Sequence, residues 1–230
     1  MLPDARYHTV RSRRVAKLRG RIGLALVACL SFLAGMTDAI GFTTTGDFVS
    51  FMSGNTTRLA VSLGQADYAL AGSILALIGA FIVGNATGVI FARVVGQRAW
   101  PLLLFASGLL FGGTVAPSNF EALILAVISM GLINAVVEEV NGLPIGLTYV
   151  TGALSRFGRG LGRWVLGERR QGWRVQLIPW VGMLVGAAVG ATLGASYSLN
   201  ALAFSGLLSI GLCMVSVAIP HRWQRAFMQK

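Results

Sequence analysis

The chain has 230 residues, of which 55% are hydrophobic and only 12% are charged, and its mean hydropathy is +0.71. Ordinary soluble domains carry about 25% charged residues, so the composition excludes a soluble globular domain and requires lipid around much of the chain. The net charge of +11 does not indicate nucleic-acid binding, because the basic residues fall in short clusters between apolar stretches.

Six stretches are apolar and long enough to form membrane-spanning helices, each of which needs about 20 mostly apolar residues. Ser118 and Glu121 form a capping-box pair at the start of the fourth. Pro101 falls in the first turn of the third, where proline is tolerated, and Pro220 closes the sixth. The predicted spans are residues 22–42, 68–94, 100–116, 120–137, 175–197 and 199–219. The expected fold class is all-α, a polytopic transmembrane helix bundle.

The positions of lysine and arginine predict how the helices cross the membrane, because cytoplasmic loops are enriched in these residues. With the N-terminus inside, 18 of the 19 basic residues fall on the cytoplasmic side, and only Arg58 lies outside. The sequence therefore predicts a protein of the bacterial cytoplasmic (inner) membrane with both termini in the cytoplasm. Residues 1–21 and 220–230 would be its two cytoplasmic tails.

The two halves of the chain resemble each other. Residues 50–64 read SFMSGNTTRLAVSLG, and residues 148–162, at an offset of 98, read TYVTGALSRFGRGLG. The same offset places Gly84 on Gly182 and Gly88 on Gly186. Each half holds three predicted spans, an odd number, so the second half would be inverted relative to the first, as in many secondary transporters. The predicted repeats are residues 22–118 and 119–219.

Asp38 is the only ionisable residue within a predicted span and away from its ends. A carboxylate in hydrocarbon is costly and usually marks a functional group facing a bundle interior or a water cavity. Asp38 would carry a proton or coordinate a cation, with Asn134 as its neutral counterpart in the second half. The alternative is that Asp38 is hydrated at the outer interface, about four residues or roughly 6 Å from the helix end.

A polar break follows the first and the fourth span, and each break leads into a short helix with an arginine near its start. Ser53 or Asn55 is the expected cap of the first short helix. Free backbone N–H groups and the positive end of the helix dipole favour an anion at such a start. Two inverted half-helices would then form a solute- or ion-binding site between the repeats. The residues of this hypothesis are Asp38, Ser53, Gly54, Asn55, Thr56, Thr57, Arg58, Asn134, Thr151, Gly152, Ser155 and Arg156.

An alternative for segments 48–64 and 146–165 is that they lie on the membrane surface. In the second segment, apolar residues recur at helical spacing from Phe157 to Val165, whereas Arg156, Arg159 and Arg163 line another face. That pattern is typical of an amphipathic helix over anionic lipid. The sequence leaves both alternatives open.

A ladder of glycines recurs at every fourth residue of the fifth span, at Gly182, Gly186, Gly190 and Gly194. Such ladders let helix backbones approach closely. The ladder would pack within the chain or form a homodimer, and the sequence does not choose.

The chain offers few residues for catalysis or metal binding. Cys29 and Cys213 lie in apolar stretches, and His8 and His221 lie in the basic tails. These positions provide no disulfide framework, no ligand set for zinc, haem or iron–sulfur clusters, and no nucleophile–base pair. We therefore expect no catalytic residue, no metal and no cofactor, and the chain is not expected to be an enzyme.

Residues 35–42 and 48–57 read GMTDAIGF and FVSFMSGNTT and resemble the YoaK-like family of bacterial multi-pass membrane proteins. Residues 142–152, GLPIGLTYVTG, also resemble that family. The resemblance runs from about residue 22 to residue 219 and implies a membrane protein of unknown function, without functional residues to carry over. The Glu138-Glu139 pair departs from it, because it places acid where a more basic loop is expected.

These features together predict a small secondary transporter or permease with its site between the two repeats. Its substrate would be a small solute or ion, and an anion is one of the candidates. The alternative is a non-transporting membrane scaffold, accessory or lipid-interacting protein. Besides the lipid bilayer and the solute, a second copy of the chain is the partner considered, and no nucleic acid is expected.

Overall fold

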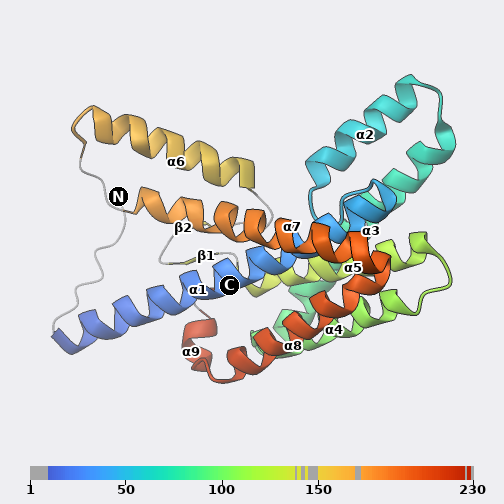
Figure 1. The fold of residues 1–230 in the computed structure, drawn as a ribbon. Coiled ribbons are helices and arrows are strands. Elements are labelled where there is room, and N and C mark those ends of the chain that lie inside the picture. Colours follow the sequence, from blue (N-terminus) through green and yellow to red (C-terminus); the bar gives the residue numbers. More distant parts are fainter. Residues whose placement is uncertain are drawn as a thin grey trace.

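The computed structural model describes residues 10–137, 139–140, 143–144, 150–168, 172–225 and 227–228. Within these residues the fold is a bundle of helices (Figure 1), and the only strands are two antiparallel strands of two residues each. His8, Glu138 and most of the motif at 142–152 lie outside the described residues. The elements are α1 Val10–Thr45, α2 Met52–Gly64, α3 Tyr68–Val94, α4 Ala99–Thr114, α5 Asn119–Ile133, η1 Asn134–Val136, β1 Glu139–Val140, β2 Leu143–Pro144, α6 Val150–Val165, η2 Trp173–Gln176, α7 Leu177–Tyr197, η3 Ser198–Ala201, α8 Leu202–Val217 and α9 His221–Gln224.

Four helical stretches of the described chain are long and apolar enough to cross a membrane: Arg14–Thr45, Tyr68–Val94, Asn119–Val136 and Trp173–Val217. Ala99–Thr114 is apolar but shorter. The last stretch contains both α7 and α8. Between them Ser198 adopts a φ of +53°, and α8 runs back in the opposite direction (Figure 1).

The first helix is longer than the sequence predicts. It begins at Val10 instead of residue 22, because the basic segment continues the same helix beyond its apolar part. It also continues through the polar residues that were expected to break it after residue 42. The hydroxyls of Thr43, Thr44 and Thr45 each donate to the carbonyl oxygen four residues earlier, at 2.7, 2.8 and 2.9 Å. The helix is likewise continuous through Asp38.

Helices α1 and α7 pack closely and run in the same direction. A Cβ at Gly182 would lie 2.7 Å from the carbonyl oxygen of Ala28, and further along the helix Gly186 and Gly190 pack against the carbonyl oxygens of Phe32 and Met36. The glycine ladder is therefore occupied within the chain. Gly186, Gly190 and Gly194 are buried in this packing, whereas Gly182 is half-buried.

Helices α3 and α5 form a second pair that also runs in one direction. Gly84 packs against the carbonyl oxygen of Ile128, and a Cβ at Gly88 would lie 2.8 Å from that of Leu132. From the opposite side, a Cβ at Gly131 would lie 2.6 Å from the carbonyl oxygen of Phe81. Close backbone contact at small residues thus holds this pair together as well.

Helix α8 packs against α4 through buried serines and completes the bundle. The hydroxyl of Ser209 donates to the carbonyl oxygen of Leu103 at 2.8 Å. Past the end of α8, the buried side chain of Gln224 accepts the backbone N–H of Ala99 at 2.8 Å. Its amide group donates to the carbonyl oxygens of Ser216 and Ile219, both at 2.8 Å. The short C-terminal helix α9 therefore ties the end of α8 to the start of α4.

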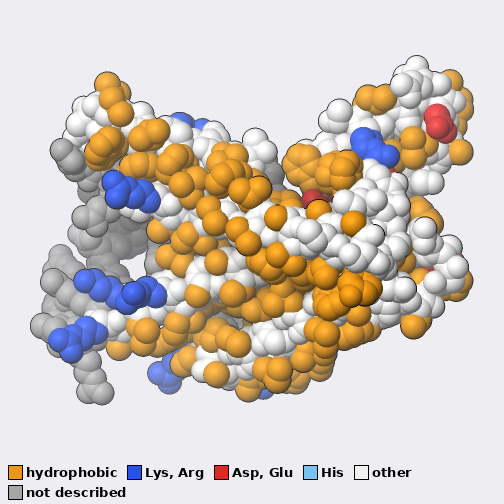
Figure 2. Space-filling model, viewed as in Figure 1, with side chains coloured by type: hydrophobic (Ala, Val, Ile, Leu, Met, Phe, Trp, Pro, Cys, Tyr) orange, Lys and Arg blue, Asp and Glu red, His pale blue; other side chains and the backbone are white. Residues whose placement is uncertain are grey.

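Charged side chains are unevenly distributed over the bundle. On the face shown in Figure 2, most visible Lys and Arg side chains lie toward the end at which α1 begins, and the acidic side chains lie toward the opposite end. Hydrophobic side chains cover the flank between the two ends. This arrangement suits a bundle whose flank faces lipid and whose ends face water.

Candidate functional site

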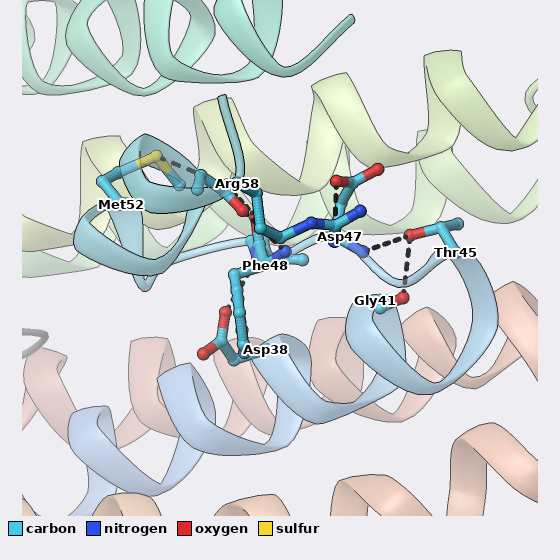
Figure 3. Close-up of polar contacts among 9 residues, drawn as sticks. Asp38, Gly41, Thr45, Asp47, Phe48, Met52 and Arg58 are labelled. Carbon is cyan, nitrogen blue, oxygen red and sulfur yellow. Dashed lines mark hydrogen bonds and ion pairs between the residues drawn. The ribbon is translucent and has the colours of Figure 1, made fainter. Parts of the chain in front are cut away.

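The predicted ionisable residue, Asp38, binds the backbone that leads into α2. Figure 3 shows its side chain close to the segment that carries Phe48. Its Oδ1 accepts the N–H groups of Val49 and Ser50 at 2.8 and 2.7 Å, and that of Phe51 at 3.4 Å. The side chain is buried, with 6% of its surface exposed. The alternative that Asp38 is merely hydrated at an interface is therefore wrong, because its carboxylate is buried against the protein's own backbone.

The cap of α2 also differs from the prediction. The residue at the cap position is Phe51, which makes no side-chain capping bond, rather than Ser53 or Asn55. A carboxylate is favoured at a helix N-terminus because it accepts free N–H groups and faces the positive dipole end. Here Asp38 supplies that carboxylate from α1, so the anion at this helix start belongs to the chain itself.

Asn55 holds the residue before this turn from the other side. Its Oδ1 accepts the N–H of Phe48 at 3.1 Å, and its Nδ2 donates to the carbonyl oxygen of Phe48 at 2.7 Å. The Asn55 side chain is completely buried. The ring of Phe48 stacks on that of Phe42, with centroids 4.5 Å apart. We call the contacts of Asp38 and Asn55 with residues 48–51 the α2 clasp.

Two glycines of the sequence motif make room for the α2 clasp. A Cβ at Gly41 would lie 2.5 Å from the side chain of Val49, and a Cβ at Gly54 would lie 2.5 Å from the ring of Phe51. These glycines therefore have a packing role. The motif at residues 35–57 specifies the turn between α1 and α2.

The hydroxyl of Ser50 is the unusual group at the α2 clasp. Ser50 is buried, and its Oγ lies beside the Asp38 carboxylate, which is the acceptor within its reach, without a hydrogen bond of full geometry to any described residue. A buried hydroxyl that is not fully hydrogen-bonded is uncommon and calls for an explanation such as a water molecule or a ligand.

The two predicted arginines have separate partners. Arg58 forms an ion pair with Asp47, with 3.0 Å between Nη1 and Oδ1. The Nε of Arg156 donates to the Oε1 of Gln176 at 2.7 Å. Asp47 follows the end of α1, whereas Gln176 precedes the start of α7.

These partners place the two arginines far apart. Because α1 and α7 run in the same direction, the two ends are separated by roughly 23 residues, or about 35 Å at about 1.5 Å per residue. The hypothesis that Arg58 and Arg156 pair around one anion is therefore wrong. The sequence similarity between residues 50–64 and 148–162 does not predict the distance between these two segments.

The short helices α2 and α6 run outward in opposite directions. In Figure 1 both begin near the middle of the bundle's length, and they diverge toward opposite ends. The other predicted residues of these helices bond locally: the hydroxyls of Thr56 and Thr57 donate to carbonyl oxygens four residues earlier. The hydroxyl of Ser155 accepts a hydrogen bond from Arg159 at 3.0 Å.

The second half lacks the α2 clasp in its full form. At the offset of 98, Asn55 corresponds to Ala153, which cannot bind backbone groups with its side chain. Asn134, the counterpart of Asp38, lies where α5 changes into the 3₁₀ segment η1. The residues that would correspond to 48–51 lie outside the described part of the chain. Thr151 and Gly152 lie in the first turn of α6.

Within the described residues, no three His, Cys, Asp or Glu side chains come together as a group that could hold a metal ion. A groove of about 610 Å³ lies between α1, α7 and α8, and its lining is apolar. None of the predicted site residues lines it. The sequence pattern predicted neither this groove nor the roles of Ser50 and Asn55. An asparagine among the first residues after a polar break is the signal that could have indicated the role of Asn55.

Comparison with known proteins extends the sequence resemblance. The family model described as "Protein of unknown function (DUF1275)" matches residues 26–215. A UPF0700 transmembrane protein of Rhizobium meliloti (strain 1021) is 48% identical over 224 residues, which make up 96% of this chain and 99% of the relative. No solved structure matches the chain. The family match covers most of α1 and α8 and all elements between them, so the similarity extends over both halves.

Proposed function

Because this chain belongs to the DUF1275 family of transmembrane proteins, we propose that it is a small permease of the inner membrane. In this proposal, two inverted three-helix repeats enclose a path for a small solute or ion. The six spans are α1, α3, α4, α5, α7 and α8, and the protein is not an enzyme. Family membership confirms the resemblance to multi-pass membrane proteins of unknown function.

The inverted repeat is supported by matched helix contacts. Gly84 meets the carbonyl oxygen of Ile128, and Gly186 meets that of Phe32 in the same way. The reverse contacts match too, because Gly131 meets Phe81 and Gly35 meets the carbonyl oxygen of Met183. Exchanging the halves converts one helix pair into the other.

These contacts refine the pairing of the halves. They match Gly84 with Gly186 and Gly88 with Gly190, one helical turn beyond the pairing given by the constant offset. The extra turn fits the connection after α6, which is longer than the connection between α2 and α3. Helices α1 and α5 are related by an offset of 96, two residues less than the offset between residues 50–64 and 148–162, and this offset pairs Gly35 with Gly131 and Asp38 with Asn134.

The proposed orientation places both termini in the cytoplasm. It is supported by the basic side chains near the end at which α1 begins, and by Arg93 in the last turn of α3 and Arg98 at the cap of α4. Cytoplasmic ends carry an excess of such residues.

The proposed transport site lies at the α2 clasp, and the buried Ser50 hydroxyl is the observation that carries it. A buried hydroxyl without a hydrogen bond of full geometry, next to a carboxylate within a predicted span, fits a small cation, a proton or a water-linked solute. Helices that begin inside a transporter near its middle commonly frame such sites. In this proposal Asp38 both fixes α2 and faces the solute.

Flux into liposomes containing the purified protein tests the proposal, with monovalent cations, protons and small anions as the solutes. Asp38→Asn keeps an oxygen for the backbone N–H groups but removes the charge, and Ser50→Ala removes the hydroxyl beside it. Both variants should lose flux while remaining folded. Ser53→Ala, at an exposed serine of α2, is the matched control and should transport normally. Absence of flux for every solute, or normal flux in both variants, would refute the proposal.

The second candidate is a non-transporting scaffold or accessory protein. It is favoured by the observation that Asp38 and Arg58 already have protein partners, so each has a structural role without any solute. This function predicts that Asp38→Asn and Ser50→Ala leave solute flux across the cell membrane unchanged while the protein stays folded.

A further inference from the structure

We propose that the apolar groove between α1, α7 and α8 is a binding site for one acyl chain of an anionic phospholipid, with Arg21 and Arg174 holding the phosphate. The site is separate from the α2 clasp and does not depend on whether the protein transports a solute. The groove has a volume of about 610 Å³ and an apolar lining.

The groove has the depth of one membrane leaflet. Helix α1 contributes Ala25, Ala28 and Phe32 to its wall, and α7 contributes Ile178, Val181 and Val185. The lining runs over nine residues of α1, from Leu24 to Phe32, and the eight steps between them rise by about 12 Å at about 1.5 Å per residue. One leaflet of hydrocarbon is about 15 Å deep, half of about 30 Å. A single chain that enters from one side therefore matches the groove.

Two arginines stand at the same end of the groove. Arg21 precedes Ala25 by four residues and Ala28 by seven, which places it on the same face of α1. Arg174 precedes Ile178 and Val181 by the same intervals. Both side chains are exposed, and the guanidinium of Arg174 lies 5.3 Å from the ring centroid of Trp173.

The parallel packing of the two helices brings these arginines to one level. Ala28 lies beside Gly182, so Arg21, seven residues before Ala28, lies about level with residue 175 of η2, next to Arg174. An acyl chain in the groove would thus present its headgroup between two cations. Arginine forms strong bidentate bonds with phosphate, and basic pockets between spanning helices are typical sites for anionic headgroups.

Native mass spectrometry of the full chain tests the proposal, in titrations with phosphatidylglycerol and phosphatidylcholine of identical acyl chains. We expect phosphatidylglycerol to be retained more strongly by the unaltered protein. The double variant R21Q/R174Q should weaken its binding by about fivefold for each arginine. It should weaken phosphatidylcholine less, because the choline cation offsets the charge of that lipid's phosphate. R93Q/R98Q removes two exposed arginines, one at the end of α3 and one just before α4, and should change neither lipid.

A groove-filling substitution tests the acyl-chain half of the site. Ala25→Phe should reduce retention of both lipids, whereas Ala86→Phe, at an exposed alanine of α3, should not. Equal retention of the two lipids by the unaltered protein, or unchanged binding in R21Q/R174Q, would overturn the proposal. It would also be overturned if the groove binds a second copy of the chain, seen as a dimer that Ala25→Phe disrupts and lipid does not.

Discussion

Replacing Asp38 by alanine should release the start of α2 while leaving the rest of the bundle intact. Hydrogen bonds to a charged group contribute about 1.5–3 kcal/mol each. Asp38 accepts two short ones, at 2.8 and 2.7 Å, and a longer one at 3.4 Å. Allowing for water that replaces part of them, we expect local opening to become easier by about 3 kcal/mol, which is roughly a hundredfold in equilibrium.

Hydrogen exchange measured by mass spectrometry in detergent micelles reads this effect directly. Peptides covering residues 48–57 should exchange roughly a hundredfold faster in Asp38→Ala, and peptides from α4 and α8 should be unchanged. Asp38→Asn should fall between the two, because a neutral acceptor forms hydrogen bonds of about half the strength. Unchanged exchange at 48–57, or equally faster exchange throughout the chain, would refute the reasoning.

Two further predictions concern helix packing and are checked by unfolding in mixed detergent micelles. Gly190→Ala should destabilise the protein by about 1–3 kcal/mol, because its Cβ would collide with the backbone of α1. Gly72→Ala is the control, because a Cβ there meets open space, and an equal loss of stability in both variants would contradict this account of the packing. Gln224→Leu should cost about 1–3 kcal/mol, because it leaves the buried N–H of Ala99 without its acceptor. A melting temperature equal to that of the unaltered protein would show that α9 does not tie α8 to α4.

Sequence patterns located the helices well where both ends carry a local signal. The prediction for Tyr68–Val94 matches α3 to the residue. Apolar composition defines its length, and the Asp67 side chain accepts the N–H of Leu70 at 3.0 Å at its start. The capping bond of Ser118 at the start of α5 is confirmed as well. The ends of α1 were missed because charged and hydroxyl residues continue a helix as readily as they break it.

The candidate site was predictable only in part: the sequence pattern singled out Asp38 and Asn55, but neither Ser50 nor the contacts. Asp38 stood out because a carboxylate within an apolar helix needs a partner. That partner is a set of backbone N–H groups, which no sequence pattern identifies. The separation of Arg58 from Arg156 could not be predicted either, because two similar segments in an inverted arrangement can face each other or lie at opposite ends. Only the direction of α1 relative to α7 decides between these arrangements.

The pairing of α1 with α7 also sets the order in which the protein can assemble. About 150 residues separate Ala28 from Gly182, and a ribosome adds about 5–20 residues per second. The inward face of α1 therefore waits in the bilayer for about 8–30 s before its partner exists. During that interval lipid, a chaperone or the insertion machinery must cover it. Neither half can be released as a finished unit, and a chain truncated before α7 leaves the first helix with an uncovered face.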